Sequence, residues 1–425
     1  MKTRMSSNSS SIKVITNKLG FVGNIIILMR SHSFLLLLFL FACNQKDGFL
    51  QEEELIMLSA NISDRQIELS ELISTIEYVP LEESSHSLVV PRFHSAVFYE
   101  EYMLLLPLGP SMNRILVYGK DGRYMQTIKS TGMGPLGFNK ISSFAKKNEK
   151  ELLISDLTKR TIYTVSVPEF VVTKELKVDF SITGIYFQDD LTLALTYENE
   201  AGMLRVLDTE MNIVKSAINY PADVYNLIPG RSPFSAWENS VLLNATLSDT
   251  IYRIFPSSNI EAYAKIGDIN STIVGLNDTD DIDFHLFDKR DITFSAESSF
   301  LFPYGFLTTY MNFSFIPLLN TRCLLWNMET NSSVLIDASS IKDYSLIHDG
   351  FIKSLNSENS SEIITTIVLT HTFYENAMKY VDKNNNHISH ELQELLTKYP
   401  KGTSFENPIL VKSVWNVDAL EKLLE

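Results

Sequence analysis

A loop near the C-terminus has the residue spacing of a cation site. Asp382, Asn384 and Asn386 alternate with other residues, so their side-chain oxygens could converge on a hard cation such as Ca²⁺. The rest of an EF-hand loop is missing, because His387 stands where glycine is needed and Gln393 where a bidentate glutamate is needed. The pattern favours the other interpretation, a polar loop that caps the helix after it.

Gly132, Gly134 and Gly137 have a spacing that resembles a phosphate-binding loop. No helical pattern and no Lys-Ser/Thr pair follows them, and the segments on both sides read as β-strands. We therefore expect these glycines to supply turn geometry.

Other polar groups give no complete site. The run Asn277–Asp283 concentrates carboxylates, and a solvated loop is favoured over a cation site. His387 and His390 are three residues apart, but the sequence shows no third zinc ligand. Neither Gly-x-Ser-x-Gly nor His-Glu-x-x-His occurs. We predict no catalytic residue, no cofactor-binding residue and no metal ligand.

Cys43 is the residue with the clearest chemical role. It follows the apolar run Phe34–Ala42, which is too short to span a bilayer but fits the hydrophobic region of a signal peptide. Leu40-Phe41-Ala42-Cys43 resembles a bacterial lipobox, in which the cysteine thiol receives lipid. We predict lipidation at Cys43; an uncleaved anchor helix is the alternative.

The start of the chain suggests a shorter precursor. Met29 to Ser33 form a short basic segment directly before the apolar run, so Met29 is a candidate for the true start. Residues 1–43 are then signal peptide and lipobox. The polar, acidic segment that follows is predicted to be a flexible tether over residues 44–66.

Composition limits the function classes. The net charge is −15 over 425 residues, without a basic stripe, which argues against nucleic acid as a partner. Hydrophobic residues make up 45% of the chain, enough for a large core. Cys43 and Cys323 are the only cysteines, so a disulfide framework is excluded, and Cys323 reads as a buried apolar residue.

From about residue 67 the sequence indicates an all-β fold. Short runs rich in Val, Ile, Tyr, Phe and Thr alternate with polar turns. A repeat, in which a polar turn leads into a strand that opens with Ile, occurs at Asn113–Tyr118, Asp156–Tyr163 and Ser248–Ile254. One such hairpin per blade is typical of a β-propeller.

Five segments carry a resemblance to a known family: Tyr78–Ser84, Ile115–Tyr124, Gly132–Phe138, Glu151–Asp156 and Glu406–Val411. They resemble the motifs of the Bacteroidetes six-bladed β-propeller lipoproteins. Position 137 is Gly where that family usually has Glu. The resemblance implies six blades around a central channel, similar to NHL-type propellers.

The predicted fold class is thus all-β, a six-bladed β-propeller over residues 67–425 with a short, partly helical C-terminal segment. Ile388, Leu392, Leu395 and Leu396 share one helical face, and Pro400 limits that helix. We expect a strand at residues 76–81 or one at residues 407–414 to complete the last blade.

Three functional hypotheses follow. The leading one is a membrane-anchored lipoprotein of the bacterial envelope, in the outer membrane and either periplasmic or surface-exposed. It would act as a non-enzymatic binding module for an envelope protein, or for a glycan or peptide being taken up. The second is a metal-dependent lyase or hydrolase with its site in the propeller channel, an analogy of fold alone. The third is a structural scaffold of an envelope complex.

Overall fold

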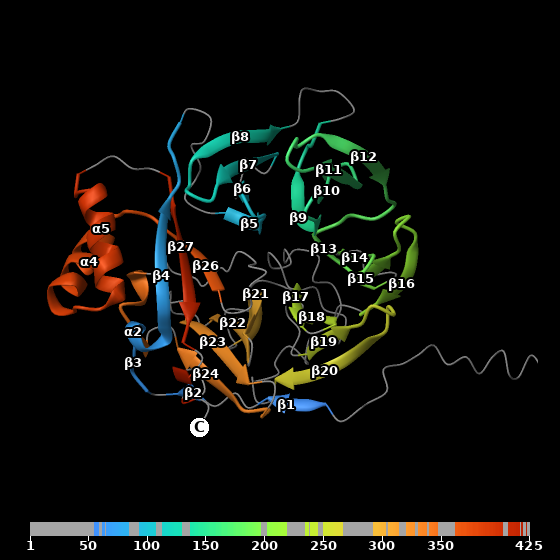
Figure 1. The fold of residues 1–425 in the computed structure, drawn as a ribbon. Helices are drawn as coiled ribbons and strands as arrows, with labels where there is room; N and C mark the ends of the chain where they lie inside the picture. The colour runs from blue at the N-terminus through green and yellow to red at the C-terminus, as the bar shows by residue number, and fades with distance from the viewer. Residues whose placement is uncertain are drawn as a thin grey trace, which may run out of the picture. The chain divides into compact units, whose positions relative to one another are not determined.

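Five four-stranded antiparallel units, here called blades 1 to 5, form most of the described chain in the computed structural model (Figure 1). The structure describes residues 55–58, 62–63, 65–84, 93–107, 113–129, 137–196, 202–218, 234–237, 239–244, 250–266, 292–302, 305–313, 320–327, 330–337, 340–346, 362–402, 407–416, 418–419 and 422. All of them lie in one compact unit, residues 52–425.

Each blade uses consecutive strands of the chain. Blade 1 contains β5 (Phe93–Phe98), β6 (Tyr102–Pro107), β7 (Arg114–Gly119) and β8 (Tyr124–Lys129). Blade 2 contains β9 (Ile141–Asn148), β10 (Glu151–Asp156), β11 (Thr161–Ser166) and β12 (Val172–Lys177). Blade 3 contains β13 (Gly184–Gln188), β14 (Leu191–Leu195), β15 (Leu204–Leu207) and β16 (Ile213–Ala217).

Blades 4 and 5 continue the pattern. Blade 4 contains β17 (Phe234–Trp237), β18 (Ser240–Asn244), β19 (Thr250–Ile254) and β20 (Ile260–Ile266). Blade 5 contains β21 (Ile292–Phe302), β22 (Gly305–Phe313), β23 (Asn320–Asn327) and β24 (Ser333–Asp337). The first strand of each blade lies toward the centre of the ring, and the fourth lies at the periphery (Figure 1).

The sequence repeat has a clear structural counterpart. Its three copies lead into β7, β11 and β19, each of which is the third strand of its blade. In blade 2 the turn is held by the Asp156 carboxylate, whose Oδ1 accepts hydrogen bonds from the backbone N–H groups of Thr158 (3.0 Å) and Lys159 (2.9 Å). At all three positions the predicted strand is confirmed and pairs antiparallel with the strand before it, and among the described residues the turn itself is seen in blade 2.

Buried side chains join consecutive blades. Leu104 of blade 1 and Ile154 of blade 2 belong to one core cluster, in which the Phe138 and Tyr163 rings meet edge to face at 5.1 Å. Similar clusters join blade 2 to blade 3 and blade 3 to blade 4. The middle strands are buried on both faces, which explains why they read as continuous apolar runs.

The prediction of six blades is wrong. In place of a sixth four-stranded blade, the described residues form a three-stranded sheet, here called the closing sheet. It consists of β26 (Glu362–Ile367), β27 (Ile409–Trp415) and β4 (Ile73–Pro80), in that order. The chain leaves the sheet after β26 to form two helices and returns as β27, while the third strand comes from the other end of the chain. The remaining expectation, an all-β propeller with a helical C-terminal segment, is confirmed.

The closing sheet contains both strands that were candidates for closure. β27 lies in the middle and pairs antiparallel with β26 on one side and with β4 on the other. Its side chains alternate: Ile409 and Val411 belong to the core cluster under the helices, whereas Leu410 belongs to the cluster shared with blade 1. One strand therefore joins the ring to the helices.

A hydrogen-bonded latch fixes this junction. The Asn407 side-chain amide donates to the carbonyl oxygens of Glu82 (2.9 Å) and Leu81 (3.5 Å), and the Asn407 N–H donates to Glu83 Oε1 (2.9 Å). Glu82 N–H donates to the Gly122 carbonyl oxygen (2.8 Å), and Tyr124 N–H donates to Glu82 Oε2 (2.9 Å). Three of the segments that carry the family resemblance thus meet at one place and have a structural role.

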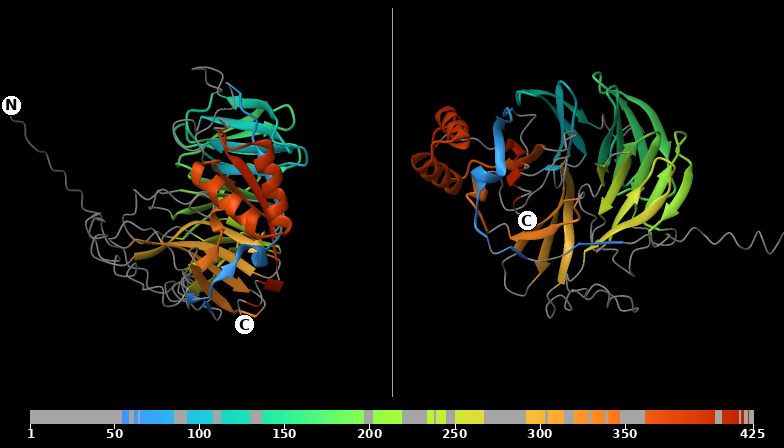
Figure 2. Two further views of the ribbon diagram at one scale, coloured as in Figure 1. Left: turned by 90° about the vertical axis from the view of Figure 1, so that its left-hand side faces the viewer. Right: turned by 60° about the horizontal axis from the view of Figure 1, so that its bottom comes forward.

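We use the name strap for the described residues between 56 and 68, which are 56–58, 62–63 and 65–68. β1 (Ile56–Leu58) pairs parallel with β20, and β2 (Ile62–Ser63) pairs parallel with β24. β3 (Ile67–Glu68) pairs with β25 (Ile341–Lys342), and the short α2 (Leu69–Leu72) leads into β4. The strap runs past the outer edges of blades 4 and 5 (Figure 2). Paired structure therefore begins within residues 44–66, the predicted tether.

Candidate functional site

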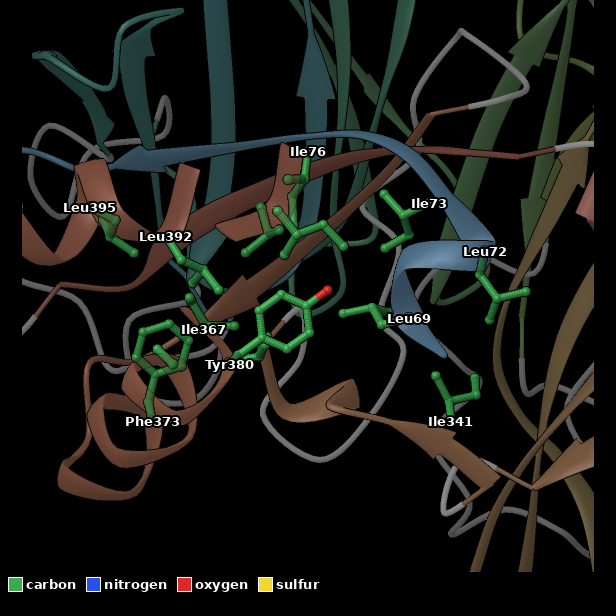
Figure 3. Close-up of a cluster of buried hydrophobic side chains, with 14 of the residues drawn as sticks. Leu69, Leu72, Ile73, Ile76, Ile341, Ile367, Phe373, Tyr380, Leu392 and Leu395 are labelled. Atoms are coloured by element: carbon green, nitrogen blue, oxygen red, sulfur yellow. The ribbon is translucent and has the colours of Figure 1, made fainter. Parts of the chain in front are cut away.

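The most distinctive element of the described chain is the helical hairpin, formed by α4 (His371–Lys383) and α5 (His387–Lys398). Four buried side chains of α4, Phe373, Tyr374, Ala377 and Tyr380, recur at helical spacing. On α5, Ile388, Leu392 and Leu395 are buried as the sequence predicted, and Leu396 is partly buried. Both helices pack through these residues onto β4 and β27 (Figure 3).

Each helix begins with a side-chain cap. Thr370 Oγ1 accepts a hydrogen bond from Phe373 N–H at 3.1 Å. At α5, Asn386 Oδ1 accepts from Ser389 N–H (3.0 Å), and Asn386 N–H donates to Ser389 Oγ (3.3 Å), which completes a capping box. The asparagines at 384–386 were the sequence pattern that predicted a polar loop capping this helix, and that prediction is confirmed.

The calcium alternative is not supported by this geometry. The Asn386 side-chain oxygen is occupied by Ser389, and the Asn384 side chain donates its amide to the Tyr380 carbonyl oxygen at 3.0 Å. One of the oxygens that were expected to converge, that of Asn386, is thus used to cap the helix. Among the described residues, no group of three or more His, Cys, Asp or Glu side chains is placed to hold a metal ion.

A cavity of about 320 Å³ opens at this turn between the helices. Its lining is polar apart from one valine: Val381, Asp382, Lys383, Asn384, Asn385, Ser389, His390 and Gln393. The volume is at the lower end of the range for small-molecule sites. Amide, ammonium and carboxylate groups at its wall can donate and accept hydrogen bonds, so the cavity suits a polar group. The sequence showed most of these residues but could not show that α4 and α5 turn them toward one space.

Tyrosine hydroxyls hold the helical hairpin in place. Tyr374 donates to the Tyr399 carbonyl oxygen at 2.8 Å, and the Asn386 amide donates to the Tyr380 hydroxyl at 3.0 Å. From β4, Tyr78 donates to the Leu346 carbonyl oxygen at 3.1 Å. Burial raises the pKa of Tyr78 well above its ordinary value, with further contributions from Tyr380 and Glu391. The Tyr78 hydroxyl therefore stays protonated and keeps donating at physiological pH.

One acidic group lies on the side of α5 near β4. Partial burial raises the pKa of the Glu391 carboxyl, and the nearby carboxylates of Glu394 and Glu77 raise it further. His387 and His390 oppose the shift in this pKa. The stability of the helical hairpin should therefore depend on pH through the protonation of Glu391.

Two serines of β9, the first strand of blade 2, hold blades 2 and 3 together through their hydroxyl groups. Ser142 Oγ donates to the Ile182 carbonyl oxygen at 2.6 Å and lies 3.0 Å from Ser155 Oγ. Ile185 N–H donates to Ser143 Oγ at 3.2 Å. These contacts join blades 2 and 3 and leave the hydroxyls engaged with the protein itself.

Several residues singled out in the sequence lie outside the described part of the chain. They are Met29, Cys43, the segment 132–136 of the glycine loop, and the acidic run 277–283. Cys323 lies on β23, opposite Thr309 and Ile336 in the ladder. No described helix is both long enough and apolar enough to span a membrane.

The ring of antiparallel blades with a closing sheet defines the chain as a β-propeller protein. The chain belongs to the family described as a domain of unknown function, DUF4934, whose profile matches residues 54–412. No curated protein matches the sequence.

Two solved structures share the fold. A protein of Bacteroides fragilis named "Putative exported protein" has a TM-score of 0.65 at 15% identity, and the alignment covers 85% of this chain and 99% of that one. A member of the DUF4221 family from Bacteroides vulgatus has a TM-score of 0.50 at 9% identity, with 81% of this chain and 97% of that chain covered. At these identities the likeness shows the fold alone.

Proposed function

We propose that this protein is an exported, envelope-associated β-propeller that acts as a non-enzymatic interaction module. One observation carries the proposal: the chain interrupts its closing sheet, between β26 and β27, with a helical hairpin that has a polar cavity at its turn. Ring closure needs only a short connection between two antiparallel strands. The extra helices therefore favour a recognition role.

The polar lining narrows the ligand class. Lys383, Asn385 and Gln393 can donate hydrogen bonds, and Asp382 can accept them. Such a set fits the hydroxyl groups of a glycan or the backbone amides of a peptide. The partner we propose is a glycan or peptide, free or displayed by an envelope protein.

Attachment to the membrane is a separate part of the proposal. The name of the Bacteroides fragilis relative supports export, and the lipobox-like sequence before Cys43 supports a lipid anchor in the outer membrane. Metabolic labelling with a fatty-acid analogue should mark the native chain and not the Cys43→Ser variant. Equal labelling of both chains would overturn the lipid anchor but would leave the binding proposal intact.

Site-specific photocrosslinking tests the binding role. A photoreactive residue at Asn385, which is exposed at the cavity, should give a discrete adduct in envelope fractions. The matched control is the same residue at Glu210, which is exposed on blade 3. Mass analysis of the adduct identifies glycan, peptide or protein. Absence of an adduct at position 385, or the same adducts at both positions, would contradict the proposed site.

A further inference from the structure

The outer edges of the blades differ in how they are covered. In blades 4 and 5 the peripheral strands β20 and β24 each receive an additional parallel strand from the strap. In blades 1 to 3 the described residues add no strand to β8, β12 or β16. An uncovered edge strand presents unpaired backbone N–H and C=O groups, so it can act as a template for another extended segment. The strap shows that the outer edges of blades 4 and 5 accept such a segment.

The first two strands of the strap, β1 and β2, pair with the blades through few of the described residues. β1 pairs with β20 through three residues, Ile56 with Ala264, Met57 with Lys265 and Leu58 with Ile266, and β2 pairs with β24 through two. Leu58 is 1% exposed, whereas its neighbour Met57 is 59% exposed. One buried side chain therefore anchors β1 to blade 4. Parallel pairing is also somewhat less stable per residue than antiparallel pairing.

The pairing and the burial of the chain are more extensive where β4 begins. β4 pairs with β27 along its length, and Ile73, Ile76 and Val79 are all buried. β1 and β2 can thus open locally while β3 and β4 keep their place, because local opening follows the local density of buried contacts and Ile67 of β3 is buried. Opening would leave the outer edge of β20 free to bind a strand with the same pattern.

We propose that the outer edges of β20 and β24 are strand-acceptor sites, and that the strap of a second copy of this chain can fill them. A second copy is the occupant that fits, because residues 56–58 and 62–63 already have the register, and Leu58 is the buried leucine, that these edges accept. Exchange of an identical element is a route to dimers that needs no new interface. The exchanged element is therefore β1 together with β2 of each chain.

Disulfide trapping between two copies tests this exchange in the full-length chain. Cys43 and Cys323 are first replaced by Ala to remove background thiols. One copy then carries Met57→Cys, and the other carries Lys265→Cys, the residue opposite in the ladder. Under mild oxidation the mixture should give a crosslinked heterodimer. A pair of Met57→Cys and Glu210→Cys copies, both exposed positions, measures random collision.

The Leu58→Asp substitution distinguishes the copy that donates its strap from the copy that accepts it. In the donor copy, which carries Met57→Cys, it should lower the yield of heterodimer about tenfold, because one buried leucine is lost from the pairing. In the acceptor copy, which carries Lys265→Cys, it should raise the yield, because the acceptor's own strap is weakened. Leu58→Ala should shift the yield in the same two directions, which keeps the test decisive if the aspartate variant does not fold.

A heterodimer yield equal to that of the Glu210→Cys control would overturn the proposal. So would an equal effect of the leucine substitution in donor and acceptor copies, because only strand exchange gives the two copies different roles.

Discussion

Blades 1 to 3 and the closing sheet have the same antiparallel pairing but obtain their strands differently. Each of the three blades is a single continuous piece of chain, from β5 to β8, β9 to β12 or β13 to β16. The closing sheet joins β4 to β26 and β27, which come from opposite ends of the described chain. Blades therefore depend on local pairing, whereas closure depends on a junction between distant segments. Removing parts of that junction should therefore affect closure of the ring more than it affects pairing within a blade.

The largest effect is expected from truncation after Pro400. This change removes β27, including Ile409, Leu410 and Val411, which are all 0% exposed. Burial of three such side chains contributes about 5–9 kcal/mol, which is comparable with the whole stability of a typical domain at about 5–15 kcal/mol. Calorimetry should show loss of cooperative unfolding. An unchanged melting temperature would contradict closure by β27.

The second effect concerns Gly122 at the latch. Its φ is +81°, and an added Cβ would lie 2.2 Å from the Pro80 carbonyl oxygen. Gly122→Ala should therefore lower the free energy of unfolding by about 2–5 kcal/mol, because left-handed strain and a backbone clash add together. Gly402→Ala is the matched control, with φ +94° but nothing within 4 Å. Its cost should be about 1–2 kcal/mol, and equal losses for the two variants in urea titrations would disprove the clash.

A smaller effect is expected at Asn407. Its side chain is fully buried and bonds to the carbonyl oxygens of Glu82 and Leu81. Asn407→Ala should cost about 1–3 kcal/mol, because at least one buried acceptor loses its donor. Asn416→Ala removes the hydrogen bond from a partly exposed side-chain amide to the Glu71 carbonyl oxygen, and it should cost less than about 1 kcal/mol. A reversed order in chemical denaturation would show that the latch does not stabilise closure.

The smallest effect is pH-dependent and involves Glu391. Because burial raises the pKa of this carboxyl in the folded protein, the protonated form stabilises the fold below the ordinary carboxyl pKa. That stabilisation is lost as the pH rises through the raised pKa. The free energy of unfolding should thus fall over mildly acidic pH by less than about 1 kcal/mol, since the side chain is partly exposed.

Glu391→Gln should flatten this dependence, and the exposed, distant Glu210→Gln should leave it unchanged. Urea unfolding curves measured across that pH range give both slopes. A profile of Glu391→Gln that follows the native chain would refute the assignment to this carboxyl.

The difference between local and distant pairing also explains what the sequence could predict. The blades were predictable, because each repeat at Asn113, Asp156 and Ser248 specifies a turn and a strand that stay together in the chain. The helix over Ile388 to Leu396 was predictable for the same reason. The blade count was not, because an average repeat length cannot show that residues 371–398 interrupt the last sheet.

The candidate site was partly predictable. The Asp382–Asn386 spacing drew attention to the correct loop, and Asn386 as a cap follows from its position before an apolar helix. The cavity depends on how α4 and α5 pack, which the spacing does not determine. The strap was missed because Ile56, Leu58 and Ile62 follow an acidic, polar stretch, although their alternation with other residues was a usable signal for a strand.

Hydrogen exchange measured by mass spectrometry tests the closing sheet most directly. Peptides that cover β27 should exchange as slowly as those that cover β6 and β10 in the interior of blades 1 and 2, because each of these three strands is paired on both sides and largely buried. Rapid exchange of β27, with slow exchange of β6 and β10, would contradict a ring closed by strands from both ends of the chain.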